Sequence, residues 1–275
     1  MDVVEIIKDA FIFPSKNIGQ LLIYELVAIV AAIFSLIGII VYVLGFVKPE
    51  CFMWGGLAGV IAMVIGWILS GYLISVVKSG IDHDDEVPKF EWWDNFITGF
   101  DNFIVSIVYF IIPAFIVFVV GYATNIYGNI IVVAQGISAQ AQAAYAGNST
   151  VIVLDPIAQA LANLAVSLAL TITVALVLFV IFSFIQTMAE ARLANTGSLS
   201  EALNVLESAK DIKRIGVGKV VVVIILVILI AYIIGMILSA IYSYVPILSI
   251  LSIIVTPYLI FFAQRAVGLL YSDIA

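Results

Sequence analysis

Apolar residues in this chain come in long runs that are separated by short polar stretches. Six of these runs reach about 20 residues or more, which is the length that a helix needs to cross about 30 Å of hydrocarbon. We therefore predict an all-α membrane protein with six transmembrane helices. The predicted spans are residues 20–47, 52–77, 102–122, 157–188, 220–242 and 247–270.

The polar stretch 78–101, which precedes the third predicted span, is amphipathic. From Pro88 onward, apolar side chains recur at helical spacing on one face and polar side chains fall on the other. Tryptophan settles at headgroup depth, because its ring is apolar while its N–H needs a hydrogen-bond partner. We expect an interfacial helix here, anchored by Trp92, Trp93 and Phe96. Trp93 should lie deeper than Trp92, because it shares the apolar face.

Two further stretches have the same character. Residues 1–17 place apolar and charged side chains on opposite faces, as in a helix that lies on a membrane surface. Ser198-Leu-Ser-Glu201 has the spacing of a capping box, which predicts a helix in the second long cytoplasmic loop, 189–219. Each amphipathic helix would lead into a pair of spans. The pattern thus predicts three parallel units related by an axis along the membrane normal, covering residues 2–77, 90–188 and 199–270.

The second predicted span carries small residues at steps of four, among them Gly55 and Gly59. Small residues at this spacing let two helix backbones approach closely in lipid. We expect this ridge to pack against another helix, and a substrate path along it is the alternative.

Basic residues determine the predicted orientation, because Lys and Arg concentrate on the cytoplasmic side of membrane proteins. With both termini inside, ten of the eleven Lys and Arg residues lie on or near the cytoplasmic side, and Lys48 is the exception. Cys51 then lies outside. The stretch 124–156 becomes a long outer loop, since it is rich in Ala and Gln and too polar to span. Asn148 in this loop begins an Asn-Ser-Thr sequence and is a candidate for N-glycosylation in a host with that machinery.

Composition supports the membrane assignment and excludes several functions. The 275 residues are 64% hydrophobic and 11% charged, whereas a soluble domain carries about 25% charged residues. We therefore expect a multi-pass protein of the cell membrane. A net charge of −7 argues against nucleic acid as a partner, because that binding needs a basic surface. The single cysteine excludes an intrachain disulfide and a CxxC site.

Three short motifs lie at the ends of the spans. Val87–Phe100 (VPKFEWWDNFITGF) joins an apolar-Pro pair, aromatic residues, an acidic residue beside tryptophan and a glycine. Met188–Leu203 (MAEARLANTGSLSEAL) leaves the fourth span, and Arg265, Gly268 and Tyr271 end the sixth. In these motifs the chain resembles an archaeal membrane family, the domain-of-unknown-function family 4013. The resemblance implies a six-helix membrane protein from an archaeal source, and it implies no activity.

The acidic stretch 82–86 surrounds the only histidine, which suggests a divalent-cation site. The candidate ligands are Asp82, His83, Asp84 and Glu86. Consecutive loop residues rarely converge on one ion, however, and hard cations take six or more oxygen ligands. A solvated loop without a metal or cofactor is the favoured interpretation. The sequence also has no GxSxG or HExxH motif, so we do not expect an enzyme.

Two other classes of function stay open. Pro113 and Pro257 interrupt spans as in many carriers, and Ser167, Thr171 and Thr173 are candidates to line a path for a small polar solute. The simpler interpretation is that the prolines make tolerated kinks and the hydroxyls bond to their own helices. We favour a membrane scaffold that binds lipid, and a protein partner or a second copy of itself, through its amphipathic helices and outer loop. A small-solute transporter or channel is the alternative.

Charged residues inside the predicted spans need a partner or a route to water. Arg265 lies near the inner end of the sixth span, and Glu25 lies at a matching depth in the first. A pair between these two residues is one hypothesis, and a pair between Arg265 and Glu190 is a second. A third hypothesis is that Arg265 extends to the headgroups without a partner, through its long aliphatic stem.

Overall fold

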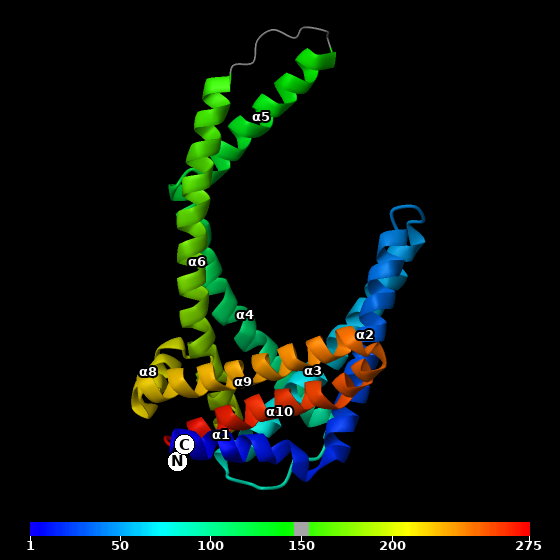
Figure 1. The fold of residues 1–275 in the computed structure, drawn as a ribbon, viewed down its shortest axis with the longest axis vertical. Coiled ribbons are helices and arrows are strands. Elements are labelled where there is room, and N and C mark those ends of the chain that lie inside the picture. Colours follow the sequence, from blue (N-terminus) through cyan, green and yellow to red (C-terminus); the bar gives the residue numbers. More distant parts are fainter. Residues whose placement is uncertain (146–153) are drawn as a thin grey trace. The chain divides into compact units, whose positions relative to one another are not determined.

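The computed structural model describes residues 1–145 and 154–275, and all regular secondary structure in this part of the chain is helical (Figure 1). Helices suit long apolar runs, because they satisfy backbone hydrogen bonds within the segment, as lipid requires. The elements are α1 (Val3–Ile12), η1 (Phe13–Lys16), α2 (Ile18–Leu44), α3 (Glu50–Ile81), α4 (Trp92–Ala123), α5 (Ile126–Tyr145), α6 (Leu154–Thr196), α7 (Leu199–Ala202), α8 (Val205–Ile215), α9 (Val217–Tyr244), η2 (Pro246–Leu251) and α10 (Ser252–Tyr271).

Among the described residues, six helical segments are long and apolar enough to cross a membrane. They are α2, α3, α4, residues 157–196 of α6, α9, and η2 together with α10. The prediction of six helices with the length and apolar composition of membrane spans is confirmed, and these helices support a multi-pass membrane protein. Pro113 and Pro257 both lie inside continuous helices, as the simpler interpretation of these prolines expects.

The third span and the amphipathic helix before it form one helix, α4. The sequence pattern separated an interfacial helix from a span at 102–122, and this separation is wrong. Residues 92–101 contain no proline, and the helix tolerates Gly99 in its interior. Two polar side chains of this helix, Asn95 and Asn102, are buried in the protein.

Helix α5 lies within the stretch 124–156, which was predicted to be a loop. Composition explains the difference: Ala and Gln are good helix formers, so a segment that is too polar to span can still be helical. Asn125, with φ of 58°, makes the turn between α4 and α5, and asparagine tolerates this left-handed conformation. The candidate glycosylation site at Asn148 lies outside the described residues.

The predicted capping box at Ser198 is also wrong. The Ser198 hydroxyl lies 3.0 Å from that of Ser200 and makes no capping bond, and α7 ends after one turn. The longer helix α8 starts at Val205, three residues after the end of α7, and the side chain of its N-cap residue Asn204 accepts a hydrogen bond from the Glu207 N–H at 3.2 Å. A capping box does form at the start of α1, between Asp2 and Glu5.

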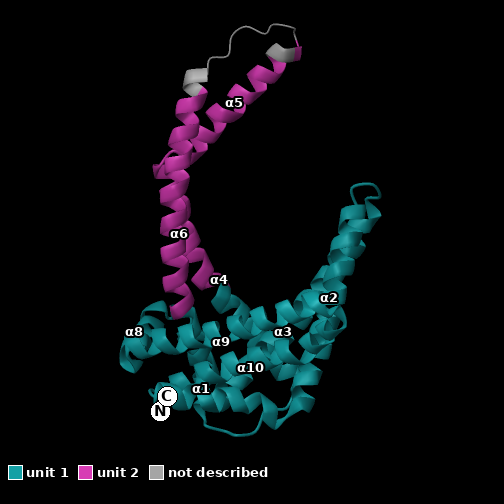
Figure 2. Cartoon of the chain, viewed as in Figure 1, with its two compact units in different colours: residues 1–106, 185–275 teal, residues 107–184 magenta. Residues whose placement is uncertain are grey.

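The chain divides into two compact units, residues 1–106 with 185–275 and residues 107–184 (Figure 2). The second unit contains the C-terminal part of α4, α5 and the N-terminal part of α6. The Ser167 hydroxyl donates to the Thr124 carbonyl at 2.7 Å, and the rings of Phe110 and Phe179 pack 5.4 Å apart. These contacts hold α6 against α4 and the turn that follows it.

Helix α3 is the central element of the first unit, and glycines allow two other helices to touch its backbone. A Cβ on Gly71 would lie 1.8 Å from the Asn95 carbonyl oxygen, and one on Gly99 would lie 1.6 Å from the Trp67 carbonyl oxygen. A Cβ on Gly268 would lie 2.1 Å from the Val77 carbonyl oxygen. The α3–α4 and α3–α10 crossings therefore require glycine, because any larger residue would separate the helices.

The predicted small-residue ridge of α3 packs against α2 in its N-terminal part. A Cβ on Gly55 would lie 2.5 Å from the Tyr42 backbone nitrogen, and a Cβ on Gly38 would lie 3.1 Å from the Gly59 backbone nitrogen. The packing is looser at Gly66, because a Cβ there would meet no other group within 4 Å. The structure thus supports the packing role at Gly55 and Gly59.

The core of the first unit lies where α3 and α10 end and α1 packs against α9 and α10. Ile6 and Ala10 of α1 are fully buried, so this helix belongs to the folded protein and does not rest only on lipid. A cluster of aromatic and aliphatic side chains continues the core. Its member Tyr72 donates a hydrogen bond to the Pro88 carbonyl at 3.0 Å. The buried members of the cluster are Phe13, Leu21, Tyr24, Tyr72, Val76, Val87 and Phe261.

Candidate functional site

The acidic loop after α3 is tied to the protein by hydrogen bonds. The Asp84 N–H donates to the Ser79 carbonyl at 2.8 Å, and the Asp84 carboxylate accepts from the Glu86 N–H at 3.0 Å. Lys16 donates to Asp85, and this hydrogen bond and charge lower the pKa of the Asp85 carboxyl. The described residues contain no group of three or more His, Cys, Asp or Glu side chains that could hold a metal. The candidate ligands Asp82, His83, Asp84 and Glu86 are therefore not brought together.

Arg265 is buried, with 1% of its surface exposed, and its partners differ from both predicted carboxylates. Its Nε donates to Asp9 at 3.1 Å, and its Nη1 donates to the carbonyls of Ser79 and Asp84, both at 2.6 Å. The Phe13 ring lies 4.4 Å from the guanidinium carbon. One guanidinium thus joins α1, the C-terminal end of α3, the acidic loop and α10.

Arg265 therefore pairs with neither Glu25 nor Glu190, and it does not extend to the headgroups without a partner. All three hypotheses about Arg265 are corrected by this arrangement. Among the described residues Glu25 has no ion-pair partner, and Glu190 accepts a hydrogen bond from Gln186 at 3.0 Å. The predicted partners lay in other spans, with Glu25 at a matching depth. The partners in the structure are Asp9 on the amphipathic helix α1, the Asp84 carbonyl of the acidic loop and the Ser79 carbonyl at the C-terminal end of α3, where the helix dipole favours a cation.

A second buried charge cluster joins α6, α8 and α10, and the sequence did not reveal it. The Asp211 carboxylate, 1% exposed, accepts from Arg192 and Arg214, each at 2.7 Å, and from the Tyr271 hydroxyl at 3.1 Å. Arg192 also bonds to Glu201 at 3.0 Å. The spacing of Asp211 and Arg214 was readable as a helical i, i+3 pair, whereas the contacts with α6 and α10 are long-range.

A third cluster brings the two chain ends together. The Asp273 carboxylate accepts from Lys219 and from the N-terminal ammonium of Met1, the latter at 3.2 Å. Burial acts to raise the pKa of Asp273, but the hydrogen bonds from Lys219 and the ammonium lower it overall. In all three clusters, basic groups are paired with carboxylates of the same protein.

The predicted interfacial anchors lie on the outer surface of α4. Trp92 and Trp93 are 57% and 71% exposed, and Phe96 stacks on Trp93 with ring centres 5.7 Å apart. The opposite face of the helix is the buried one, although it carries the polar residues Asn95 and Asn102. We call such a helix inverted, because its apolar face is exposed and its polar face is buried, the opposite of an amphipathic helix in a soluble protein. In a bilayer the apolar face turns to lipid and the polar groups turn to the protein.

The inward face of α4 forms a polar seam with α3 and α6. Asn102 donates from Nδ2 to the Ser70 hydroxyl at 2.9 Å, and Ser75 donates to Asn95 Oδ1 at 3.4 Å. Gln186 of α6 donates from Nε2 both to the Ser106 hydroxyl at 3.2 Å and to the Glu190 carboxylate at 3.0 Å. The polar seam therefore consists of Ser70, Ser75, Asn95, Asn102, Ser106, Gln186 and Glu190.

Two atoms of the seam have no hydrogen-bond partner in the described part of the protein. They are Nδ2 of Asn95 and Oδ1 of Asn102. The two residues are 2% and 9% exposed, respectively. Buried polar atoms are almost always paired with protein, water or an ion. The polar seam was not predicted from the sequence. The signal that reveals it is the spacing of Asn95, Asn102 and Ser106, which places them on one helical face.

Other polar candidates of the sequence analysis lie in the second unit. The Thr173 hydroxyl donates to the Ala169 carbonyl of its own helix at 2.8 Å, as the simpler interpretation expects. Ser167 bonds instead to the turn at Thr124. The Thr171 hydroxyl oxygen is buried and has no partner among the described residues.

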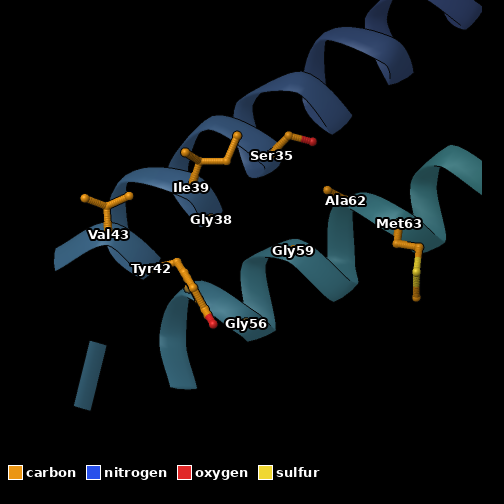
Figure 3. Close-up of a pocket in the computed structure, with 10 residues that line it drawn as sticks. Ser35, Gly38, Ile39, Tyr42, Val43, Gly56, Gly59, Ala62 and Met63 are labelled. Carbon is orange, nitrogen blue, oxygen red and sulfur yellow. The ribbon is translucent and has the colours of Figure 1, made fainter. Parts of the chain in front are cut away.

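The α2–α3 hairpin holds an apolar groove of about 600 Å³, shown in Figure 3. Small residues from both helices form its floor, and its polar side chains are the hydroxyl groups of Ser35 and Tyr42. Among the described residues that line it there is no carboxylate, histidine, cysteine or basic side chain. Its lining suits alkyl groups. The lining residues are Ser35, Gly38, Ile39, Tyr42, Val43, Gly55, Gly56, Gly59, Ala62 and Met63.

Comparison with known proteins agrees with the motifs noted in the sequence. No curated protein and no solved structure matches the chain. Residues 54–243, well over half of the chain, match the family described as "Protein of unknown function (DUF4013)". The match covers α3 to α9 almost completely and includes the polar seam. This chain therefore belongs to the DUF4013 family of proteins of unknown function.

Proposed function

We propose that this protein is a membrane scaffold, which binds lipid headgroups and a protein partner through its surface helices and the N-terminal end of α4. The inverted helices carry the proposal. The N-terminal part of α4 buries Asn95 and exposes Trp93, and α8 buries Asp211 while Leu206 is 75% exposed. Large apolar side chains that stay exposed beside a membrane surface suit insertion between headgroups or docking of a partner.

The charge clusters support the same role. Arg192, Arg214 and Arg265 are all engaged by carboxylates of the protein, which joins the helix ends into one connected layer. Such a layer holds exposed side chains in a defined arrangement, which lowers the entropy cost of binding a partner. We place this layer on the cytoplasmic side of the cell membrane, with both termini inside, on the distribution of Lys and Arg.

The test compares exposed apolar residues at opposite predicted ends of the molecule. Trp93→Ser and Leu206→Ser should each abolish a stoichiometric complex isolated from native membranes in mild detergent and identified after cross-linking. Tyr244→Ser, at an exposed aromatic residue on the predicted outer side, should leave that complex intact. Loss of the complex in all three variants, or a protein that stays a solitary monomer, would contradict the proposal.

A small-solute transporter is the second candidate, and the polar seam is the observation that favours it. Transporters bind their solutes at polar groups between helices. In proteoliposomes the scaffold should leave the permeability to small polar solutes unchanged, whereas a transporter should raise it. A rise that Asn102→Leu removes would favour transport over scaffolding.

A further inference from the structure

The polar seam contains an acceptor that the protein leaves unpaired. Asn102 uses Nδ2 to donate to Ser70, which directs its Oδ1 away from that bond, and Oδ1 is buried without a donor among the described residues. A buried carbonyl without a partner is costly in low-dielectric surroundings. The atom requires either a donor, such as water, or a cation.

The residues next to Asn102 supply further oxygen atoms. Ser106 follows Asn102 by one helical turn on the same face of α4, and Gln186 precedes Glu190 by one turn on α6. The bond from Gln186 to Ser106 holds these two pairs against each other. Side-chain oxygens of an amide, a hydroxyl and a carboxylate thus lie on facing turns of two helices.

These side chains carry one negative charge, which a single positive charge would balance. Glu190 is the one carboxylate of the seam, and its bonded partner is the neutral amide of Gln186, so no cation of the protein balances it among the described residues. An uncompensated carboxylate inside a spanning helix is expensive. A bound cation of charge +1 would neutralise Glu190 and pair with Asn102 in the same site.

We infer that oxygen atoms of Asn102, Ser106 and Glu190 form a binding site for a monovalent metal cation of the size of sodium or potassium, and that the Gln186 amide positions Ser106 and Glu190 by donating to both. Hard cations prefer oxygen ligands, which this set provides. A divalent ion would need more than one carboxylate to be balanced here. The inference does not depend on the scaffold proposal, because a scaffold and a transporter can each hold a structural cation.

The experiment measures thermal unfolding of the purified full-length protein in detergent, in sodium, potassium or N-methyl-D-glucamine chloride at equal ionic strength. Binding to the folded state alone raises the melting temperature, and we expect a rise of at least about 3 °C in one of the metal salts. Glu190→Gln and Asn102→Leu should abolish the rise. Glu25→Gln, which removes a spanning-helix carboxylate outside the seam, should retain it.

Direct binding of radioactive sodium or rubidium to the folded protein gives a second readout, with folding checked by size-exclusion chromatography. If Glu190→Gln does not fold, Ser106→Ala is the milder variant and should weaken binding severalfold. Equal melting temperatures in all three salts would overturn the inference. So would a metal-dependent rise that Glu190→Gln and Asn102→Leu leave unchanged, or a dependence on pH without any on the cation, which would assign the site to water and protons.

Discussion

At the scale of single residues, this protein uses each buried charge to join several elements. Arg265 contacts a carboxylate on α1, two backbone carbonyls and an aromatic ring, and Asp211 accepts from α6, α8 and α10. A buried charge is stable only when its hydrogen-bonding capacity is filled. Such residues therefore act as connections between helices rather than as simple pairs.

Arg265→Gln should lower the stability in detergent by about 3–5 kcal/mol, because it leaves two carbonyls and a carboxylate without their buried donor. Asp9→Asn should cost less, since Asp9 is 31% exposed. The double variant should be more stable than the sum of the single losses predicts, as expected for groups in contact. A thermal-unfolding cycle measures this, with Glu25→Gln as the additive control. Strict additivity of Asp9→Asn and Arg265→Gln would contradict the observed pair.

Asp273 should make stability depend on pH. Its pKa is lower in the folded protein than in the unfolded chain, so its contribution is present above the unfolded pKa and is lost as pH falls through the folded pKa. Melting temperature should therefore fall below about pH 4, near the ordinary pKa of aspartate. Asp273→Asn should flatten this acid-side fall. Asp82→Asn, in the acidic loop, is the matched control, and equal acid profiles for all three proteins would contradict the linkage.

At the scale of elements, close backbone contact and inverted amphipathicity decide how the helices meet. Helix α3 touches α4 at Gly71 and Gly99 and touches α10 at Gly268. Helix α4 presents its polar side chains to these contacts and its tryptophans to the outside. In lipid, no hydrophobic effect separates the two faces, so small residues and hydrogen bonds select the packed face.

Gly71→Ala should destabilise the protein by roughly 1–3 kcal/mol or more, because the added Cβ would overlap the Asn95 carbonyl and force α3 and α4 apart. Gly66→Ala on the same helix should be neutral or slightly stabilising. Its Cβ would meet no other group within 4 Å, and alanine is the better helix former. Unfolding temperatures of the two variants in detergent provide the measurement. Equal effects at both positions would rule out the close crossing.

At the scale of the whole molecule, the six spanning helices make a multi-pass protein, while its orientation rests on the distribution of basic residues. Cys51 lies at the start of α3, on the predicted outer side. The three-unit repeat also stays a prediction, and its second unit has no separate interfacial helix, because α4 is continuous.

A membrane-impermeant maleimide should label Cys51 in intact cells, because the predicted topology places it outside. Ala275→Cys in a Cys51→Ser background should react only after lysis. Labelling is read from the mass or fluorescence of the purified protein. The reverse pattern would show that the termini lie outside.

Membrane location, the number of spans and the helical class followed from the sequence by itself. Hydrocarbon thickness sets the length of an apolar run, and lipid leaves helices as the structure for such runs, so local composition is sufficient. The Ala- and Gln-rich stretch shows the limit of this reasoning. Polarity excluded a span there but did not exclude helix α5, because helix formation needs no apolar residues.

Only the tertiary structure decided the partners of Arg265, the seam around Asn102 and the inward face of α4. Apolar periodicity identifies two faces of a helix, but it does not say which face meets the protein when lipid is the surroundings. Asp9 and Arg265 lie 256 residues apart, and no local pattern links them. Buried polar contacts depend on the position of every helix that surrounds them, and for this reason the charges and polar groups were assigned by packing.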